Sequence, residues 1–340
     1  MVKKIVAEEM PVDSIPPKLE SIEVAVKKSK GALLIGGGGG GDVVQTVPMM
    51  NFLQTLGLKN IVLANTSINW WKYLPGKIAA GGGDVYSVNQ LTSAKILGKN
   101  VAQVSGKTVL KSGPGKGHSP HEAVIAGLFD VPAFTIGIQD GTQGIVEGLK
   151  IIVKKYDLDM VMAIDMGADS FYSGKEHTIA SPLIDSIVTA AILQLGIPAY
   201  FVLAGYGCDA ELSIAQLNKN VGEVMRCGGF LGAHGLTPED LKCMERIFKD
   251  NTITLEKWGY LAARGNIGSG YTKEYYSFES TPLTAMLLFF DPSVIVNHLN
   301  PLPNLVSKTT SLKQTEDIFL KIGLVPETRR PMFVPNMLDQ

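Results

Sequence analysis

The chain has 340 residues, of which 45% are hydrophobic and 19% charged, and its formal net charge is -1. This composition is typical of a globular protein with a sizeable core, built as one large α/β domain or as two smaller ones. Because 31 basic residues nearly balance 32 acidic ones, the charge supports neither nucleic-acid binding nor a polybasic membrane contact. We therefore expect no nucleic acid and no membrane among the partners.

Cysteine spacing and the N-terminal stretch bear on the compartment. The three cysteines form no C-x-x-C pair, so they indicate neither a zinc site nor a disulfide framework. The stretch MVKKIVAEEMPVDSIPPK carries acids and prolines where a secretory signal is apolar. Gly196 and Pro198 interrupt the apolar stretch 187–205, which predicts a buried helix, a turn and a buried strand rather than a membrane span. We expect a cytoplasmic protein.

Short apolar runs alternate with helical patterns, which is the signature of βαβ units in a mainly parallel sheet. Pro48 indicates that the first helix is kinked or starts later, near Val47. The apolar runs predict buried strands at 32–36, 60–65, 133–138, 160–165 and 200–205. The helical patterns predict helices at 42–56, 120–129, 143–156, 182–195 and 210–224.

Two Ser-Pro pairs mark predicted helix starts. The sequence S-P-H-E from Ser119 predicts a capping box with proline at the first helical position, and S-P-L-I-D from Ser181 repeats the Ser-Pro start. The segment 65–117 is rich in glycine and weakly periodic, and it predicts only irregular loops and short strands.

From Gly228 onward the pattern changes, with helices predicted from Leu236 and Leu255 and one apolar run at 285–290. We expect residues 228–340 to form a mainly helical portion that packs on an α/β core of residues 1–227. The predicted fold is a three-layer, Rossmann-like α/β fold with a mainly parallel sheet and helices on both faces.

A run of six glycines follows the first predicted strand and ends at Asp42. Fixing six glycines costs much conformational entropy, so something must approach this backbone closely. The run contains G-x-G-x-x-G, but the second strand ends in Asn65, where a dinucleotide fingerprint requires an acid. Because backbone N–H groups at a helix N-terminus bind anions, we expect the run and Asp42 to hold a phosphate group. The run consists of Gly36, Gly37, Gly38, Gly39, Gly40 and Gly41.

Acidic residues follow several of the predicted strands. The carboxyl ends of parallel strands meet at one edge of a sheet, so we expect these acids around one cleft with the glycine run. Carboxylates that converge without basic partners repel one another unless a cation lies between them, and Mg²⁺ prefers such oxygen ligands. The predicted Mg²⁺ ligands are Asp165, Asp169, Asp209 and Glu211, and Asp140, Gly205 and Gly207 are expected to join the glycine run in binding the ligand.

Simpler explanations stay open for some of these acids. Asp42 and Asp209 each precede a predicted helix and fit as N-caps, while Asp140 in Q-D-G-T fits a turn. Asp185 lies in the first turn of its predicted helix, where the helix dipole alone explains a carboxylate. Asp165 is the hardest to explain in this way, because it ends an apolar strand and is followed by a glycine and a second acid.

Several motifs in a fixed order resemble a known family, the largely archaeal proteins catalogued as domain of unknown function 1152. The matching positions are Gly36 to Gly41 with Asp42, then Asp165, Gly167 and Asp169, then Gly174 and Glu176, then Ser181, Pro182, Leu183 and Asp185, and lastly Gly205, Gly207, Asp209, Glu211 and Leu212. Ala168 and Ala210 stand where the family has glycine, which affects backbone detail more than chemistry. The resemblance implies the fold class and marks a site, and it implies no assigned activity.

The leading hypothesis is a Mg²⁺-dependent enzyme acting on a phosphorylated small molecule or nucleotide, by phosphoryl transfer, glycosyl transfer or hydrolysis. Glu176 and His177 are the candidate acid and base, since a histidine titrates near neutral pH. The alternatives are a nucleotide- or metabolite-binding protein without catalysis and an oxidoreductase using NAD(P) or FAD, which the missing acid at Asn65 disfavours. A homo-oligomer is compatible with the sequence, although no residue demonstrates one.

Overall fold

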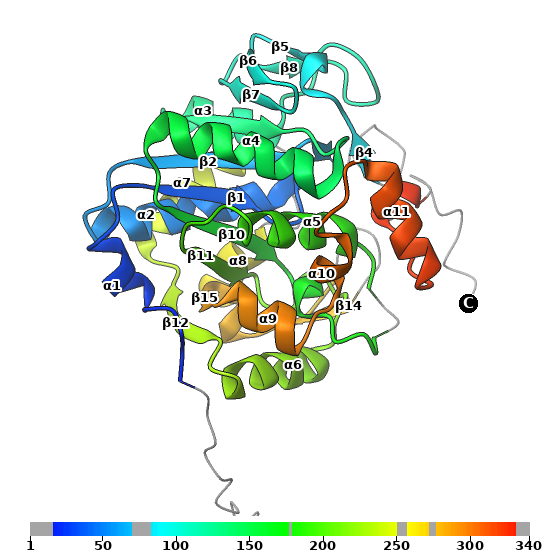
Figure 1. Ribbon diagram of the computed structural model, residues 1–340. Coiled ribbons are helices and arrows are strands. Elements are labelled where there is room, and N and C mark those ends of the chain that lie inside the picture. The colour runs from blue at the N-terminus through cyan, green and yellow to red at the C-terminus, as the bar shows by residue number, and fades with distance from the viewer. Residues whose placement is uncertain (1–15, 70–82, 177–178, 250–256, 272–276, 331–340) are drawn as a thin grey trace, which may run out of the picture.

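A nine-stranded sheet crosses the middle of the protein in the computed structural model, which describes residues 16–69, 83–176, 179–249, 257–271 and 277–330 (Figure 1). The strand order is β12-β15-β11-β10-β1-β2-β9-β7-β6. The bounds are β1 Ala32–Gly36, β2 Ile61–Thr66, β6 Lys95–Gly98, β7 Val101–Val104, β9 Ala133–Ile136, β10 Met160–Met166, β11 Ala199–Ala204, β12 Phe230–Gly235 and β15 Met286–Phe290.

The centre of the sheet is parallel, with neighbours in the order β9-β2-β1-β10-β11. In chain order these are the third, second, first, fourth and fifth of the parallel strands, so the winding reverses between β1 and β10. Ligands of open α/β sheets bind at the carboxyl edge where such a reversal occurs. The five strands are those that the apolar runs predict, and the α/β fold with a mainly parallel sheet is confirmed.

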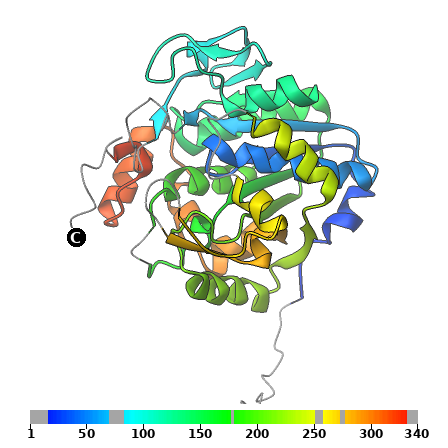
Figure 2. The ribbon, with the colours of Figure 1, turned by 180° about the vertical axis from the view of Figure 1, so that it is seen from behind.

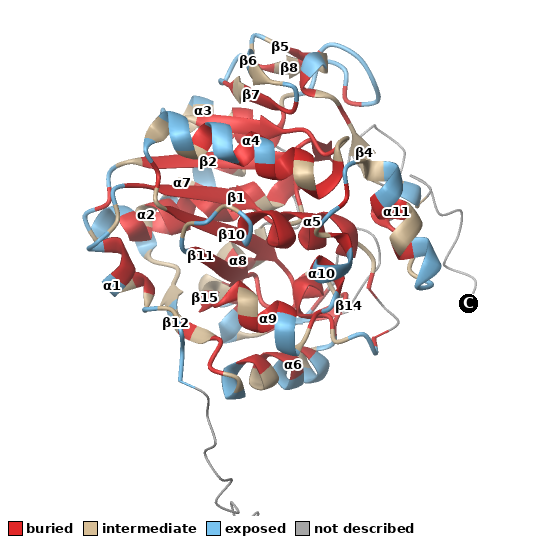
Figure 3. Cartoon of the chain, in the orientation of Figure 1, coloured by how far each residue is buried: buried red, intermediate tan, exposed pale blue. Residues whose placement is uncertain are grey.

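Helices cover both faces of the sheet (Figures 1 and 2). Their bounds are α1 Ile22–Val26, α2 Thr46–Thr55, α3 His121–Phe129, α4 Gly141–Tyr156, α5 Pro182–Ile192, α6 Ile214–Arg226, α7 Pro238–Ile247, α8 Lys257–Ala263, α9 Pro292–His298, α10 Leu302–Val306 and α11 Leu312–Lys321. Alternate residues of a strand point to opposite faces. Leu33 therefore joins the core beneath α4 and α5, whereas Leu34 joins the core beneath α2. Figure 3 shows these central strands buried along their length.

The chain from 228 onward is largely helical, as its pattern predicts, but it also supplies strands to the main sheet. The apolar run at 285–290 becomes β15, which pairs antiparallel with β11, and β12 pairs antiparallel with β15. Helix α10 packs on α5, and α11 packs on α4. The sequence pattern misses the two added strands, because their pairing joins segments that are far apart in the chain.

Short strands appear in the weakly periodic region, as expected. They include β3 Ile68–Asn69 paired with β4 Asp84–Val85, and β5 Leu91–Thr92 paired with β8 Val109–Leu110. Residues 70–82 of that region lie outside the described residues. A further hairpin, β13 Gly268–Tyr271 with β14 Ser277–Ser280, lies in the C-terminal portion.

Two helices start several residues away from the predicted position, and one predicted helix cap is wrong. The helix predicted at 42–56 begins as a 3-10 turn, η1 Gly40–Gln45, and α2 starts at Thr46, as Pro48 suggests. Helix α6 starts at Ile214 instead of 210, because Ser213 and Gln216 form a capping box. The capping box predicted at Ser119 is wrong: Pro120 is the N-cap of α3, and the carboxylate of Glu122 bonds to other buried groups instead.

The apolar stretch 187–205 forms the end of α5, a turn and β11, as its glycine and proline predict. Among the helices that the structure describes, none combines the length and the apolar character needed to cross a membrane.

Candidate functional site

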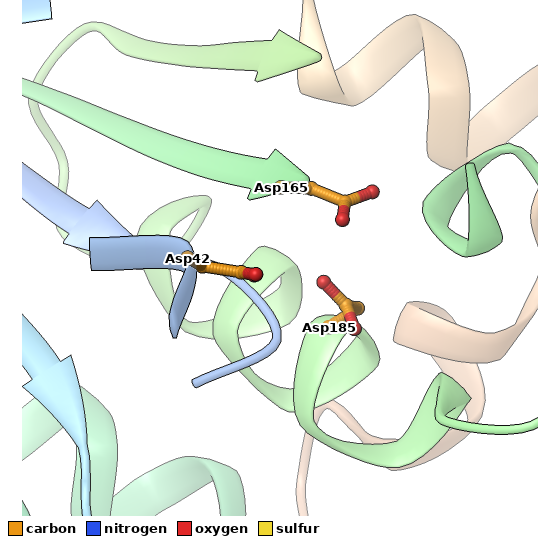
Figure 4. A group of neighbouring side chains, drawn as sticks. All are labelled: Asp42, Asp165 and Asp185. Atoms are coloured by element: carbon orange, nitrogen blue, oxygen red, sulfur yellow. The ribbon is translucent and has the colours of Figure 1, made fainter. Parts of the chain in front are cut away.

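Three aspartates meet at the carboxyl edge of the sheet, where the winding reverses. Asp165 lies at the end of β10, Asp42 in the turn η1 that follows β1, and Asp185 in the first turn of α5. Their side chains point toward one another (Figure 4). One carboxylate oxygen of each lies within 4.8 Å of those of the other two. We call Asp42, Asp165 and Asp185 the aspartate triad.

Each member of the triad is fixed by its neighbours. Oδ2 of Asp42 accepts a hydrogen bond from the backbone N–H of Gly38 at 2.5 Å. This bond fixes the side chain of Asp42 against the glycine run. Oδ1 of Asp185 accepts one from the hydroxyl of Ser170 at 3.3 Å. The simpler explanation of Asp42 as an N-cap is wrong, because it lies inside η1 and its side chain bonds back to the loop.

Asp165 has a buried oxygen without a partner. Its side chain is 2% exposed, and Oδ2 has no hydrogen-bond partner among the residues that the structure describes. Burial raises the pKa of Asp165 to about 7, hydrogen bonds from Ser170 oppose the rise, and the charge of Glu211 adds to it. A buried, unpaired carboxylate oxygen is costly and rare in folded proteins. The triad is therefore a candidate site for a positively charged group.

Further acids surround the triad, and their oxygens are bound by the protein itself. Asp209 accepts hydrogen bonds from the N–H groups of Ala168 and Glu211 at 2.8 and 3.1 Å. Glu211 accepts the hydroxyl of Ser181 at 2.6 Å, and the same hydroxyl lies 3.0 Å from Asp169. These acids therefore hold the loops that follow β10 and β11, and Asp209 is not the N-cap of α6.

The pKa values of the whole cluster are raised mainly by burial and further by repulsion between the acids. Burial is the main cause that raises the pKa values of Asp169, Asp185 and Asp209, and the charges of neighbouring carboxylates raise them further. The pKa of Glu211 is also raised by burial, against hydrogen bonds from Ser181 and a smaller lowering by Arg330. The raised pKa values mean that the ionised forms of these carboxylates are disfavoured, and a cation placed between carboxylates stabilises their ionised forms.

Glu327, in the C-terminal turn η5 Glu327–Arg329, binds the start of the helix that carries Asp185. Its carboxylate accepts the N–H groups of Leu183 at 3.1 Å and Ile184 at 2.8 Å. These are N–H groups that the first turn of a helix leaves without intrahelical partners. Burial raises the pKa of Glu327 to about 7. A carboxylate distant in the chain thus takes the capping role, while the hydroxyl of Ser181 is used by Glu211 and Asp169.

We expect Glu327→Ala to destabilise the protein by about 1–3 kcal/mol, because two buried N–H groups lose their acceptor. Glu327→Gln keeps an acceptor oxygen and is expected to cost less. Thermal unfolding of both variants at one pH measures the difference. Equal stability of the alanine variant and the unchanged protein would contradict a capping role.

The glycine run is approached by side chains of the protein itself. A Cβ on Gly37 would lie 3.1 Å from Oδ1 of Asp185, and one on Gly38 would lie 2.9 Å from carboxylate oxygens of both Asp185 and Asp42. On the other side, a Cβ on Gly36 would lie 2.6 Å from Oδ1 of Asn65, and Gly39 lies against the hydroxyl of Thr66. The run is thus a bare backbone between two polar walls.

Gly39→Ala is expected to cost more stability than Gly57→Ala. Gly39 has φ 79° and ψ -164°, a conformation that is essentially restricted to glycine and costs other residues about 1–3 kcal/mol. A methyl group there also meets Thr66 and Ile68. Gly57 has φ 98° but nothing within 4 Å of an added Cβ, so it isolates the backbone strain. Denaturant unfolding of both variants compares them, and equal losses would show that contact with the β2 side is unimportant.

Other predicted site residues lie apart from the triad or outside the described part. Oδ2 of Asp140 pairs with Lys99 at 2.5 Å and accepts from Asn100 at 2.9 Å, and these contacts lower its pKa. His177 lies outside the described residues, so its predicted role as acid or base stays a prediction.

Glu176 is held by its own loop. Its carboxylate accepts hydrogen bonds from Ser173 and from Asn220, which outweigh burial and lower its pKa. Its acid–base role stays a prediction, and these contacts favour a structural one. Gly205 and Gly207, with φ 57° and 72°, form the turn after β11, and the N–H of Gly207 donates to the carbonyl of Gly167 at 3.0 Å.

Asp185 is the member of the triad that is absent from the predicted Mg²⁺ ligands, because its place in the first turn of a helix already explains a carboxylate there. The family motif S-P-L-x-D does include it, and that was the signal available in the sequence. The pattern of one helix start cannot show that this turn lies over the ends of β1 and β10.

Comparisons with curated proteins and with solved structures give no significant match. A family model described as "Protein of unknown function (DUF1152)" matches residues 33–330, which extends well beyond the motifs around the glycine run and Asp165. It includes the triad, the surrounding acids and Glu327. Because this match covers most of the sequence, the chain belongs to the DUF1152 family.

Proposed function

We propose that this protein binds Mg²⁺ through the aspartate triad and acts, as an enzyme, on a phosphorylated small molecule held against the glycine run. The observation that carries the proposal is Oδ2 of Asp165, a buried carboxylate oxygen without a partner in the described residues. The side chain that carries it lies beside two further carboxylates. A cation supplies the missing partner and offsets the mutual repulsion of the acids.

The donor set fits a hard divalent cation. All three groups offer oxygen, which Mg²⁺, Mn²⁺ and Ca²⁺ prefer, and no described cysteine or histidine is part of the group. Oxygens bound at about 2.1 Å to Mg²⁺ lie about 3.0 Å apart when adjacent and about 4.2 Å apart when opposite. The triad oxygens all lie within 4.8 Å of one another, so a bound cation needs at most a small further approach of the side chains. The triad would supply part of the coordination, and water and substrate the rest.

The glycine run supports a phosphate group beside the cation. Gly40 and Gly41 begin the turn η1, and the first N–H groups of a helical turn lack intrahelical partners. Such N–H groups bind phosphate oxygens. The unscreened carboxylates repel an anion, so phosphate is expected to bind after the cation or together with it. When bound, Mg²⁺ would polarise the phosphoryl oxygens. The chain itself holds the cation through the triad and orients the phosphate through the loop backbone.

Isothermal titration with Mg²⁺, Mn²⁺ and Ca²⁺ tests the cation site, and Zn²⁺ serves as a competing softer metal. A panel of phosphorylated metabolites, assayed with and without Mg²⁺ for phosphate release or transfer, tests catalysis. Binding of a hard cation followed by Mg²⁺-dependent turnover supports the proposal. Cation-dependent ligand binding without turnover on any member of the panel would favour the alternative of a non-catalytic binding protein. Absence of hard-cation binding would contradict both.

A further inference from the structure

Buried polar atoms without partners gather around the glycine run. Four side-chain atoms in the described part of the chain are buried without a hydrogen-bond partner: Oδ2 of Asp165, Oδ1 of Asn65, Oγ1 of Thr66 and Nδ1 of His121. The first belongs to the triad, and the next two lie on the opposite side of the run, at the end of β2. Unpartnered buried groups are rare, so their concentration at one loop needs an explanation.

The side of the run away from the triad is formed by Asn65 and Thr66, which we call the β2 wall. Asn65 is 1% exposed and Thr66 is fully buried. A Cβ on Gly36 would lie 2.6 Å from Oδ1 of Asn65, and Gly39 covers the hydroxyl of Thr66. In both places a glycine without a side chain lies against the polar oxygen. The loop therefore closes over the β2 wall without bonding to its side-chain oxygens.

The orientation of the Asn65 amide is set by its other contacts. Its Nδ2 donates to the carbonyl of Gly40 at 3.0 Å and to Oε2 of Glu122 at 3.1 Å. Both of these partners are acceptors, so the nitrogen must face them and Oδ1 must face the loop. The carboxylate of Glu122 is held in turn by the hydroxyls of Thr135 and Tyr86. The network behind the wall is thus built to present an acceptor, Oδ1, and a hydroxyl, Oγ1.

The charge of the β2 wall favours a neutral partner. Asn65 and Thr66 are uncharged, and Glu122, fully buried behind them, disfavours a second phosphate or a carboxylate. Oδ1 of Asn65 requires a donor, whereas the hydroxyl of Thr66 both donates and accepts. Neighbouring residues of a strand point to opposite faces, so the two atoms need separate groups, and a ligand with more than one hydroxyl group supplies them.

We propose that the ligand is a sugar phosphate or polyol phosphate, whose hydroxyl groups bind Asn65 and Thr66 while its phosphate lies with the cation at the triad. The phosphate half of this inference rests on the proposed function. The run must move away from Thr66 for a ligand hydroxyl to enter. Glycine permits such a change of backbone conformation at every position from 36 to 41.

The unpartnered hydroxyl allows a functional role to be separated from a structural one. If Thr66 serves only the fold, replacing it by valine should leave ligand binding unchanged. If the hydroxyl binds a ligand and has no partner in the free protein, Thr66→Val removes an unsatisfied buried group. The variant is then expected to maintain or raise the melting temperature of the free protein. Thr135→Val is the matched control on the next strand, because its hydroxyl is bonded to Glu122 and its loss should lower the melting temperature.

The experiment measures the affinity of the full chain for D-ribose 5-phosphate, glycerol 3-phosphate and ethyl phosphate, each with and without Mg²⁺. Ethyl phosphate carries a phosphate ester without a hydroxyl group. We expect the two hydroxylated probes to bind at least about tenfold more tightly than ethyl phosphate in the unchanged protein, the effect of one or two hydrogen bonds. In Thr66→Val we expect that ratio to fall toward one, with unchanged affinity for Mg²⁺ alone.

Equal binding of all three phosphates by the unchanged protein would overturn the hydroxyl site and leave the proposed cation function standing. A ratio that Thr66→Val does not change would also overturn it. Failure of Mg²⁺ to bind would overturn the proposed function instead. In that case the ratio measured without Mg²⁺ decides this inference: a retained hydroxyl preference supports the β2 wall as a subsite, and no preference overturns it.

Discussion

The Asp165→Asn variant is expected to bind Mg²⁺ and Mn²⁺ more than about 100-fold more weakly than the unchanged protein. Removing even an outer partner of a metal ligand costs about 10–100-fold, and this change replaces a charged ligand at the centre of the triad. The same substitution removes a buried carboxylate whose Oδ2 has no partner in the described residues. The metal-free variant is therefore expected to be at least as stable as the unchanged protein, since it no longer buries that charge.

These two readouts together separate loss of a ligand from loss of the fold. Titration calorimetry gives the affinity, and thermal unfolding in a chelating buffer gives the stability. Asp317→Asn is the matched control, because the Asp317 side chain on α11 is 44% exposed and pairs with Lys313 away from the cluster. A variant that binds Mg²⁺ as well as the unchanged protein would remove Asp165 from the site. A variant that fails to bind and also unfolds more easily would point to a structural role.

Without divalent cations, the protein is expected to become less stable as the pH rises toward 7. Burial raises the pKa values of Asp165 and Glu327 to about 7, above the usual carboxyl values of about 4. Between these limits the folded state holds protons that the unfolded state has released. Stability therefore falls with rising pH, by at most about 1.4 kcal/mol per pH unit for each group, and the loss is complete above about pH 7.

Mg²⁺ should reverse this loss, because it binds the ionised carboxylates of the folded chain. A cation at 100 times its dissociation constant stabilises by about 2.7 kcal/mol. Because protons compete for the same oxygens, the stabilisation by a fixed Mg²⁺ concentration is expected to be larger at pH 8 than at pH 5.5. Urea unfolding at both pH values, with Mg²⁺ and with chelator, measures both effects.

One variant separates the contribution of Glu327 to the pH dependence from that of the aspartate triad. Glu327→Gln removes one titrating group while leaving the aspartate triad intact, so it should reduce the pH dependence and retain the Mg²⁺ effect. Stability that rises between pH 5.5 and pH 8 in chelator would contradict the buried, uncompensated cluster. Equal Mg²⁺ stabilisation at both pH values would contradict binding through these carboxylates.

The parallel core of the fold could be predicted because its information is local. Each of the strands β1, β2, β9, β10 and β11 is a short, continuous apolar run, and such runs are typical of strands buried on both faces. The placement of Asp165 followed from the same rule, since an acid at the end of a buried parallel strand lies at the carboxyl edge of the sheet. The antiparallel strands β12 and β15 escaped prediction because their pairing is decided by packing between distant segments.

The candidate site was predictable only in part, for a related reason. Asp185 has a sufficient local explanation in the helix dipole, and only the fold shows that its turn faces Asp42 and Asp165. In the sequence, Asn65 occupies the position where a dinucleotide-binding fingerprint has an acid. In the structure, the carboxylate of Glu122 from α3 is buried beside Asn65 and accepts a hydrogen bond from its amide. A sequence pattern contains no signal for such a pairing, because the two residues belong to separate elements whose packing brings them together.

The contact between Glu327 and α5 has a consequence for the order in which the protein is made. The acceptor and the N–H groups that it binds are separated by 144 and 143 positions along the chain. A nascent chain that has emerged from the ribosome only as far as α11 can form the parallel sheet, but the first turn of α5 then lacks its cap. Asp185 belongs to that turn, so the proposed cation site would reach its final geometry only after Glu327 has been synthesised. Cation affinity would in this way distinguish a finished chain from a partly made one.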